Sequence, residues 1–553
     1  MSQSKKNRSN FLVQGSILAM ASIISRIIGL VYRLPMTAIL KDVGIGYYGT
    51  AFEIYNVMLI ISSYSLPLAV SKLVSAKLGQ GNKTGAYQIL KGALVFAAVS
   101  GGTVSLIVFF GADYLAGIMN TPMSAYALRV LGPGLVVVAV LGVIRGFFQG
   151  TGTMVPSAVS QVIEQIVNAV VSVWAAYVLY NYGKRIGEVL GDKEHYSAAY
   201  GAAGGTLGTL MGSVAALIFV CIIFVTYLKV FKKKMKKEHN VEVDSFSYTM
   251  KILIATIIPV LLSTTVYNIS ASIDQGIFKN IAALQGYLPD KTDAWYGVFT
   301  GKYRLLINVP ISIASAMVAS AVPKLTSSYA QGDLEAVRHQ IQASTRFIMV
   351  IAFPCTVGLM ALARPILILL FPTTVGNIDV ATNMMLIGSV AIIFYSISTL
   401  SNGLLQGIDK LKIPVINACI ALVTHVLLLI FLMLAFRLGI YAVVIANTFF
   451  AFIMCILNSK AIVKYSGFER EYKKTYIIPA LCSVIMGVLT FFTYHGVYKI
   501  IRRNSVAVIF AFVVAFISYG VLLLLLKGLT EDELRHFPGG RQLVKMAKMV
   551  HLM

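Results

Sequence analysis

Long apolar runs recur along the whole chain and are separated by short segments rich in lysine and arginine. A helix that crosses the hydrocarbon core of a bilayer needs roughly 20 consecutive apolar residues, and each of these runs is long enough. The runs predict fourteen membrane spans, at residues 11–40, 47–78, 86–112, 124–150, 155–181, 200–229, 250–280, 295–327, 340–370, 377–407, 412–436, 438–463, 474–498 and 505–527. Because only 12% of the residues are charged, against about 25% in a soluble domain, we expect an all-α integral membrane protein.

The positively charged residues predict which side of the membrane each loop faces. If the N-terminus lies in the cytoplasm, the inner loops and adjoining helix ends contain most of the 46 lysines and arginines, including the cluster at residues 232–237. This asymmetry follows the positive-inside rule, and a miscounted helix would blur it partway along the chain. An even number of spans then places both termini in the cytoplasm. The formal net charge of +24 is therefore a topology signal, and we expect no nucleic-acid partner.

Three sequence pairings indicate that two halves of the chain repeat one plan. YGTAFEIYNVMLII, from Tyr48, matches YGVFTGKYRLLIN, from Tyr296; SKLVSAKLGQGNKTGAYQIL matches PKLTSSYAQGDLEAVRHQI, and GFFQGTGTMVP matches GLLQGIDKLKIP, in the same order. The pairings predict an N-lobe at residues 1–230 and a C-lobe at residues 250–465, joined by a basic cytoplasmic linker at residues 231–249. In transporters built from such repeats, the substrate binds between the halves near the bilayer midplane.

Two segments follow the repeat. Residues 466–528 contain the last two predicted helices, and residues 529–553 form a predicted cytoplasmic tail. The tail opens with a capping-box pattern from Thr530 to Glu533 and continues with basic residues on one helical face. That pattern is typical of an amphipathic helix on an anionic leaflet.

Two arginines, Arg26 and Arg33, lie inside the first apolar run. A charge near the bilayer centre costs roughly 2.5 to 3.5 kcal/mol on insertion scales, so each arginine needs a polar environment. Residues seven apart share a helix face, and this face also carries Ser22 and several small residues. Such a stripe belongs against the interior of the bundle or a water-filled cavity.

The eighth run carries Arg304 on a face with Asn308, whereas Lys302 lies on the apolar side of an ideal helix. Arg33 and Lys302 are closer to the outer ends of their helices, where the alternative is that they snorkel to lipid headgroups. For Arg26 and Arg304, the alternative is a structural ion pair with a buried acid.

Three acids inside the spans are available for such pairs, namely Glu53, Glu164 and Asp274. Four bases against three acids leave a positive surplus, which suits an anionic cargo and above all phosphate, because arginine presents a planar fork of donors. We therefore predict a substrate-binding set that consists of Arg26, Arg33, Arg304, Lys302, Ser22, Glu53 and Asn308. Asp274 and Glu164 are candidates for coupling an ion, and which acid pairs with which arginine stays open.

Three further patterns favour packing roles. A polar stripe in the fifth run suits interhelix hydrogen bonds or a hydroxyl-rich cargo; it consists of Gln161, Gln165, Asn168 and Ser172. Small-xxx-small spacing, typical of closely packed helices, occurs at Gly204, Gly208 and Gly212. We expect His425 to be a hydrogen-bonded core histidine.

The segment SRIIGLVYRLP at residues 25–35, the YRLLINVP run from Tyr303, the repeated QG turn before a proline and the six, six and two helices resemble the multidrug/oligosaccharidyl-lipid/polysaccharide (MOP) flippase superfamily. Within it, the chain looks like the MurJ-like lipid II flippases and their relatives of the stage V sporulation protein B type. The resemblance implies a multi-pass protein of the bacterial plasma (inner) membrane. It would move the undecaprenyl-pyrophosphate-linked peptidoglycan precursor, lipid II, from the inner to the outer leaflet by alternating access, in support of the cell wall and cell shape.

The resemblance also implies roles for residues of the site. The arginines of helix 1 in this family match Arg26 and Arg33, and its helix 8 arginine matches Arg304. Residues 466–528 match the two helices that form a groove for the lipid tail. Where Gram-negative members carry an arginine in helix 2, this chain has Ser62 and Ser63, which leaves the headgroup of the cargo open.

Two alternatives belong to the same superfamily: a flippase for another lipid-linked oligosaccharide or polysaccharide, and a cation-coupled multidrug exporter. A membrane transferase acting on polyprenyl phosphate would need clustered acids for a metal, and the nearest acids, Asp290 and Asp293, lie in a predicted short outer loop. The five cysteines show neither metal-type nor disulfide spacing. We expect a monomeric transporter, and not an enzyme, with no metal or cofactor, driven by the membrane potential or a monovalent cation. Its expected partners are an anionic lipid-linked substrate and membrane lipids.

Overall fold

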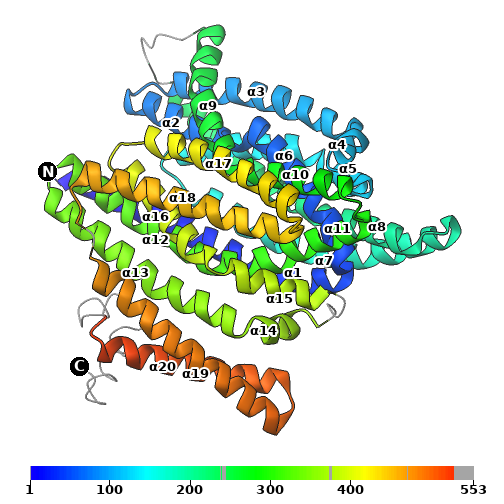
Figure 1. Cartoon of the computed structure of the whole chain (residues 1–553). Coiled ribbons are helices and arrows are strands. Elements are labelled where there is room, and N and C mark those ends of the chain that lie inside the picture. Colours follow the sequence, from blue (N-terminus) through cyan, green and yellow to red (C-terminus); the bar gives the residue numbers. More distant parts are fainter. Residues whose placement is uncertain (1, 237, 239–244, 373–376, 470, 529–553) are drawn as a thin grey trace. The chain divides into compact units, whose positions relative to one another are not determined.

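The computed structural model describes residues 2–236, 238, 245–372, 377–469 and 471–528, and within these residues the chain forms helices joined by short turns (Figure 1). Ten of the helices in the described part are long and apolar enough to cross a membrane, or eleven if the bent pair Ile378–Gly388 and Ala391–Gly407 is one span. The protein is therefore a multi-pass helical membrane protein, while the count of fourteen stays a prediction. The expected amphipathic tail at residues 529–553 lies outside the described residues.

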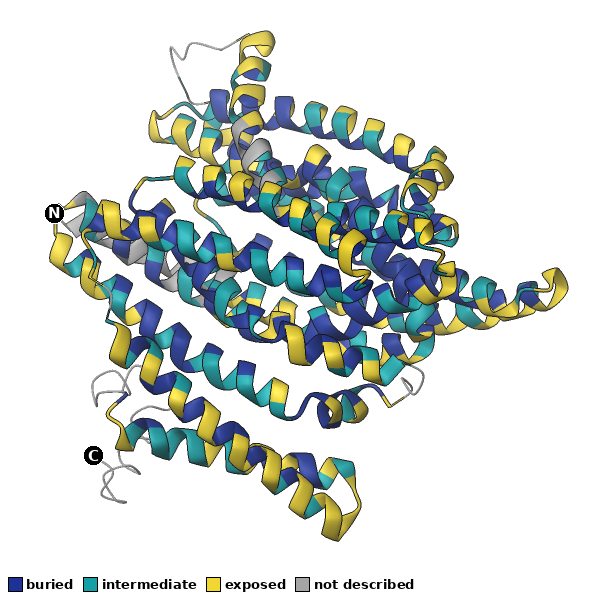
Figure 2. Ribbon diagram, in the orientation of Figure 1, coloured by how far each residue is buried: buried dark blue, intermediate teal, exposed yellow. Residues whose placement is uncertain are grey.

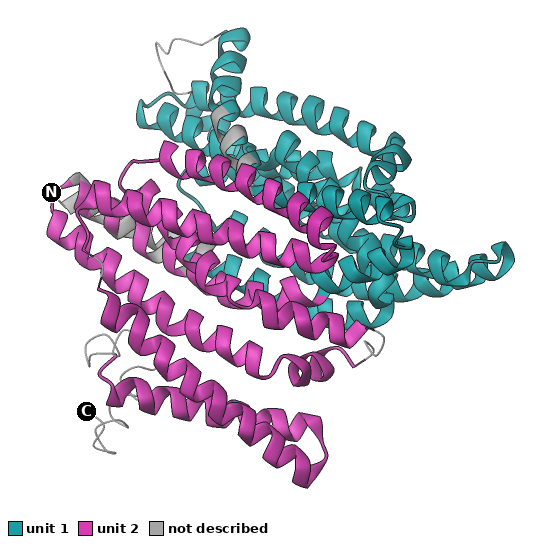
Figure 3. Ribbon diagram, viewed as in Figure 1, with its two compact units in different colours: residues 1–301 teal, residues 302–553 magenta. Residues whose placement is uncertain are grey.

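The chain forms two compact units, residues 1–301 and residues 302–553 (Figure 3). The helices of the first unit are α1 (Ser2–Leu59), η1 (Ile60–Tyr64), α2 (Leu66–Gly79), α3 (Lys83–Phe110), α4 (Ala112–Ile118), η2 (Pro122–Ser124), α5 (Ala125–Leu131), α6 (Gly134–Gly150), α7 (Val155–Leu190), α8 (Lys193–Met235), α9 (Phe246–Asn268), α10 (Ser270–Leu284) and α11 (Pro289–Val298). The π-helical turn η3 (Phe299–Tyr303) follows α11.

The second unit is described in the same way by its own helices. They are α12 (Arg304–Ala330), α13 (Leu334–Ala361), α14 (Ala363–Leu370), α15 (Ile378–Gly388), α16 (Ala391–Gly407), α17 (Lys412–Phe436), α18 (Ile440–Ser466), η5 (Lys473–Ile477), α19 (Ile478–Ile501) and α20 (Asn504–Leu525). Helices α19 and α20, the last two predicted spans, lie side by side, and α19 also packs on α13 (Figure 1).

Helix α1 contains the break that separates the first two predicted spans. The helical stretch from Met20 to Gly79 has 60 residues, or about 90 Å, which is about three times the thickness of the hydrocarbon core. At Lys41 the backbone leaves the helical region, with φ 56° and ψ −171°. A single residue therefore makes the turn between the two spans.

Exposed positions recur along the helices of each unit (Figure 2), and many of them are large apolar residues, as expected of surfaces that lie in lipid. On α20, for example, Phe516 is 77% exposed and Ile517 is 57% exposed. Exposing such apolar surfaces to water costs free energy, whereas exposing them to lipid hydrocarbon does not. Hydrogen bonds satisfy polar groups such as His425 in the interior: the Nδ1–H of buried His425 donates to the carbonyl oxygen of Ala446 (2.8 Å), which confirms its expected role in the core.

Glycines hold α7 and α8 in close contact. A Cβ atom added at Gly204 would overlap the backbone of Ala175, and one at Gly208 would overlap the backbone and hydroxyl of Ser172. Gly212 lies in the same way against the backbone carbonyl of Glu164. The close-packing role predicted from the small-xxx-small spacing is confirmed.

Helix α8 begins with a charged turn that precedes its predicted span at residues 200–229. The imidazole of His195 lies between two carboxylates, with Nδ1 2.6 Å from Asp192 Oδ1 and Nε2 2.6 Å from Asp290 Oδ1. Partial burial alone would lower the pKa of His195, but the two hydrogen-bonded carboxylates outweigh it and raise this pKa above its usual value. Since Asp290 belongs to α11, the histidine ties the start of α8 to that helix.

A second carboxylate fixes the start of α3. Glu238 accepts hydrogen bonds from the backbone N–H groups of Lys83 (2.8 Å) and Thr84 (3.0 Å). Burial would raise the pKa of Glu238, but these hydrogen bonds and the Lys83 ammonium lower it. The contact thus anchors Glu238, which follows α8, to the first backbone N–H groups of α3, which have no acceptor within the helix.

We predict that Gly208→Ala destabilises the protein by about 2 kcal/mol, because the added methyl group meets backbone atoms that cannot move aside. Gly102→Ala is the matched control, since a Cβ atom at Gly102 meets nothing within 4 Å. The control variant should keep or gain stability, because alanine favours helices over glycine by up to about 1 kcal/mol. Thermal unfolding of the purified protein in detergent measures both, and equal stability of the two variants would contradict the packing described here.

We predict that the contribution of His195 to stability depends on pH. Because the pKa of His195 is raised in the folded protein, the contribution is fully present below the unfolded-state value of about 6.5 and disappears as the pH rises through the raised value. The difference in melting temperature between the parent and His195→Gln should therefore be larger at about pH 6 than at about pH 9. A difference that is constant over this range would show that the charged bridge contributes nothing.

Candidate functional site

A seam of polar side chains joins α1 to α7 in the first unit. The hydroxyl of Ser22 donates to Gln161 Oε1 (3.3 Å), and that of Ser25 lies 3.4 Å from the carbonyl oxygen of Gln161, which accepts its hydrogen bond. About two turns further along, the side-chain amide of Asn168 donates to Tyr32 Oη (3.4 Å). Interhelix hydrogen bonding, one of the two roles open for this stripe, is therefore confirmed for Gln161 and Asn168.

Both arginines of α1 lie on this polar part of the helix. The side chain of Arg26 is exposed, and it forms no ion pair with any residue that the structure describes. Arg33 is half-buried and close enough to Tyr48 to interact with it electrostatically. The guanidinium of Arg26 therefore stays available to an anion from outside the chain.

Glu164 is paired with an arginine that the sequence pattern did not single out. Arg145, on α6, donates through Nη2 to Glu164 Oε2 (2.8 Å) and through Nε to Ser160 Oγ (2.8 Å). Both side chains of the ion pair are mostly buried, at 13% and 22% exposure. Arg145 lies near the end of its apolar run, where a charge is typical of a residue beside a loop. Once this pair is set aside, the expected surplus of bases over acids becomes larger.

The other two acids inside the predicted spans are both buried. Glu53 is 7% exposed on α1, and Asp274 is 2% exposed on α10. Their helices are in direct contact, since the hydroxyl of Ser272 donates to the backbone carbonyl of Glu53 (3.1 Å). The proposed roles of Glu53 in binding and of Asp274 in ion coupling stay predictions.

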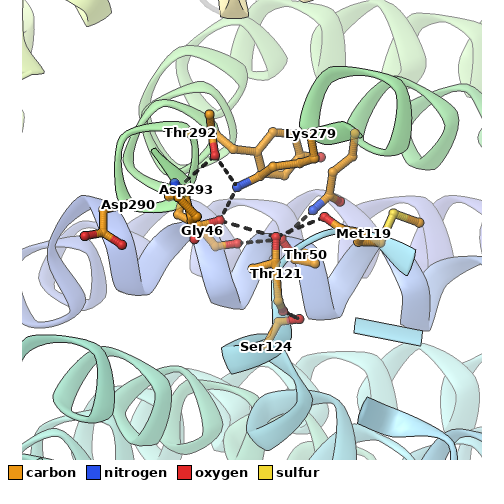
Figure 4. Close-up of polar contacts among 12 residues, drawn as sticks. Gly46, Thr50, Met119, Thr121, Ser124, Lys279, Asp290, Thr292 and Asp293 are labelled. Atoms are coloured by element: carbon orange, nitrogen blue, oxygen red, sulfur yellow. Dashed lines mark hydrogen bonds and ion pairs between the residues drawn. The ribbon is translucent and has the colours of Figure 1, made fainter. Parts of the chain in front are cut away.

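A buried ion pair lies where α10 and α11 meet (Figure 4). The ammonium of Lys279 contacts the carboxylate of Asp293, and these residues are 1% and 3% exposed. Asp293 also accepts a hydrogen bond from Thr121 (3.3 Å), and Lys279 donates to Thr292 (3.4 Å). Nearby, Gln275 donates to Thr50 of α1.

The expectation that Asp290 and Asp293 lie in a short outer loop is wrong. Both belong to α11, which begins at Pro289. A proline in the first turn followed by an acid is a helix-start signature, which could have identified the helix. No sequence signal could have identified the partner, because Lys279 ends an apolar run and looks like an ordinary loop charge.

The predicted site residues of the second unit lie at its start. Lys302 is 3% exposed, Arg304 is half-buried and Asn308 is exposed. The helical wheel that placed Lys302 on an apolar side assumed α-helical spacing, but Lys302 lies in the π-helical turn η3. Such turns change the angular spacing of side chains and often occur at functional sites. A buried Lys302 does not extend to lipid headgroups as the snorkelling alternative required.

Arg26 and Arg33 belong to the first unit, whereas Lys302 and Arg304 belong to the second. The site that these residues share therefore stays a prediction. Within the described part of the chain, no group of three His, Cys, Asp or Glu side chains could hold a metal ion.

Comparison with known proteins places the chain among membrane transporters. A family model described as "Polysaccharide biosynthesis protein" matches residues 12–329, and a MatE model matches residues 281–431. Lipid II flippase MurJ of Bacillus subtilis (strain 168) is 26% identical over 504 residues, which cover 87% of this chain and 88% of that protein. Stage V sporulation protein B of the same organism is 22% identical, with 96% and 98% covered.

Solved structures show the same fold. Lipid II flippase MurJ in an inward closed conformation has a TM-score of 0.64 at 14% identity and covers 92% of this chain and 98% of that one. An inward-facing multidrug resistance MATE family transporter of the MOP superfamily also has a TM-score of 0.64, at 16% identity, with 81% and 96% covered. Since the first family model covers more than half of the sequence, the chain belongs to the polysaccharide biosynthesis protein family.

Proposed function

We propose that the protein is a flippase that carries undecaprenyl-pyrophosphate-linked peptidoglycan precursor, lipid II, from the inner to the outer leaflet of the plasma membrane. The observation that carries this proposal is the exposed guanidinium of Arg26, which has no carboxylate partner among the described residues although it lies inside an apolar run. A cation in that position is costly unless water or an anion solvates it. Pyrophosphate matches it, because two N–H groups of arginine bind two phosphate oxygens at once.

The surroundings of Arg26 suit a headgroup that combines phosphate with sugar. Ser22 and Ser25 precede Arg26 on α1 by four and one residues, and their hydroxyl groups are hydrogen-bonded to Gln161 of α7. In this proposal Arg304 and Lys302 also bind the pyrophosphate during transport. The relative named lipid II flippase MurJ supports the choice of cargo, at 26% identity.

A flippase for another lipid-linked oligosaccharide is the second candidate, and a specific observation favours it. Ser62 and Ser63 stand where Gram-negative MurJ-like proteins have an arginine, and here they are buried and joined by a 2.8 Å hydrogen bond. Ser63 also donates to the carbonyl oxygen of Leu135 (3.4 Å), so this region of the chain makes structural contacts. A cation-coupled multidrug exporter is the third candidate.

The remaining expectations belong to the same proposal. The protein would work as a monomer with both termini in the cytoplasm, with helices α19 and α20 beside the lipid tail. The membrane potential would return the empty, positively charged carrier, or a monovalent cation would bind near Asp274 or Glu164.

We predict that Arg26→Ala and Arg304→Ala each lower flipping by about 10- to 100-fold, because each removes a charge-assisted contact worth about 1.5 to 3 kcal/mol. Arg129→Ala is the matched control, since Arg129 pairs with Asp113 at an exposed helix end. The assay depletes the host's own lipid II flippase, supplies each variant, and measures how much lipid II an impermeant reagent reaches from outside. Amounts of protein in the membrane are measured in parallel.

The same assay distinguishes the candidates. Lipid II that stays inside despite normal amounts of parent protein would favour a flippase for another lipid-linked oligosaccharide, and unchanged lipid II with altered drug sensitivity would favour the exporter. Full activity of both arginine variants would rule out the proposed site.

A further inference from the structure

The span formed by α15 and α16 in the second unit is bent, and the bend changes the backbone hydrogen bonding (Figure 1). The two helices make an angle of 51° where α15 ends at Gly388 and Ser389 follows, and Gly–Ser pairs are a common cause of sharp kinks. At the bend, the N–H of Ile392 donates to the carbonyl oxygen of Ser389 (3.0 Å). In a continuous α-helix this N–H would donate to Gly388 instead. The carbonyl group of Gly388 therefore needs another donor, because a buried carbonyl without one is costly.

Tyr303 supplies that donor. Its hydroxyl donates to the carbonyl oxygen of Gly388 (3.2 Å), and the tyrosine is 2% exposed. A Cβ atom added at Gly388 would overlap this hydroxyl, so only glycine leaves room for the tyrosine. Thr448 of α18 forms a second side-chain hydrogen bond with Tyr303. The tyrosine thus joins the segment that leads into α12 to the bend and to α18.

Helix α12 also contacts the bent span beyond the bend. A Cβ atom added at Gly403 of α16 would overlap the side chain of Val318 of α12, and one at Gly407 would lie 3.0 Å from the side chain of Leu325. Helices come this close where glycine leaves room. The body of α12 is therefore packed along α16, while the hydrogen bond of Tyr303 fixes the start of α12 at the other side of the bend.

The start of α12 carries a residue of the predicted binding set. Arg304 is the first residue of α12 and follows Tyr303, which ends the π-helical turn η3. Arg304 also lies close enough to the side chain of Tyr303 to interact with it electrostatically. A shift of the backbone at Tyr303 would redirect the Cα–Cβ bond of Arg304, because the direction of a side chain follows the backbone that carries it. A buried hydrogen bond therefore controls the direction of an arginine that is itself only half-buried.

We propose that Tyr303 is the positioning residue of Arg304: its hydroxyl, bonded to Gly388 at the bend, holds the start of α12 so that Arg304 is directed toward the anionic headgroup. The inference rests on the proposed function, and it adds a role that no motif assigned to this tyrosine. Tyr303 itself does not contact the cargo. Without its hydroxyl the start of α12 takes up further orientations, and a guanidinium that is less well ordered beforehand binds pyrophosphate more weakly.

The first test measures how strongly the purified protein prefers undecaprenyl pyrophosphate over undecaprenol, by native mass spectrometry. Tyr303→Phe keeps the ring and removes the hydroxyl, so it should lower this preference about threefold to tenfold. Tyr519→Phe is the matched control, because the Tyr519 hydroxyl of α20 also donates to a backbone carbonyl of another helix in the second unit, that of Val350 (2.7 Å). The control variant should keep the preference of the parent protein.

A double-mutant cycle shows whether Tyr303 acts through Arg304. In an Arg304→Ala background, Tyr303→Phe should cause no further loss of preference, whereas a tyrosine with a merely structural role would cause the same loss in both backgrounds. Gly388→Ala is an independent variant, because the added methyl group displaces the hydroxyl of Tyr303. It should lower the preference at least as much as Tyr303→Phe, and it decides the question if Tyr303→Phe fails to fold.

A second measurement does not depend on the cargo. Spin labels are attached to Leu386→Cys on α15 and Val309→Cys on α12, two exposed positions, after the five native cysteines are replaced. Double electron–electron resonance then reports the distances between the two helices. Tyr303→Phe should broaden the distribution of these distances, and Tyr519→Phe should leave it unchanged.

A pyrophosphate preference that stays at the parent value in Tyr303→Phe and Gly388→Ala would overturn the positioning role and leave the proposed function in place. An equal loss in Tyr519→Phe, or a further loss in the Arg304→Ala background, would also overturn it. If the parent protein binds both lipids equally, the proposed function fails. Broadened distances in Tyr303→Phe would then still support the joint between α12 and the bend, and unchanged distances would overturn that joint as well.

Discussion

The cost of removing a charged side chain from water governs the structure more than any other interaction. In a chain with apolar faces turned to lipid, every internal charge needs a partner, a hydrogen-bond network or water. Arg145 and Glu164 solve the problem by pairing, as do Lys279 and Asp293. Arg26 is the exception, since its guanidinium is exposed and forms no ion pair within the described part of the chain. The family resemblance assigns Arg26 to the substrate, together with Arg33 and Arg304.

Paired and unpaired internal charges have different consequences for the protein. A pair such as Arg145 with Glu164 holds α6 against α7 and leaves the chain neutral at that point. A cation without a partner keeps the binding region positive until an anion arrives. If the anion is the pyrophosphate of a lipid-linked cargo, its binding neutralises the region and removes the cost of exposing it to a drier environment. Charge balance would then couple occupancy of the site to movement of the lobes.

The sequence was sufficient for features that depend on local pattern. Small-xxx-small spacing predicted that Gly204 and Gly208 would pack closely against another helix, and a histidine inside a predicted span was expected to be a hydrogen-bonded core residue, as His425 is. Composition identified a helical membrane protein, and the polar stripe around Gln161 was correctly expected to suit hydrogen bonds between helices.

Pairings between distant helices could not be predicted. Lys279 and Asp293 meet because two helices fold back on α1, and neither residue stands in a pattern that points to the other. Arg145 lies near the end of an apolar run, where a charge is as typical of a loop as of an ion pair. An ideal α-helical projection placed Lys302 on the apolar side, but a π-helical turn changes the spacing of the side chains there. The residue types of this segment do not predict such a turn. The structure therefore adds the contacts between distant helices and the irregular backbone segments, which local sequence patterns do not predict.

In the proposed function, Arg26 binds the pyrophosphate group of the lipid-linked cargo. Native mass spectrometry of the purified protein, with undecaprenyl pyrophosphate and undecaprenol offered in equal amounts, tests this most directly because the two lipids share one tail. The account predicts that the pyrophosphate lipid binds at least about tenfold more tightly and that this preference disappears in Arg26→Ala. Equal binding of the two lipids by the parent protein would contradict it.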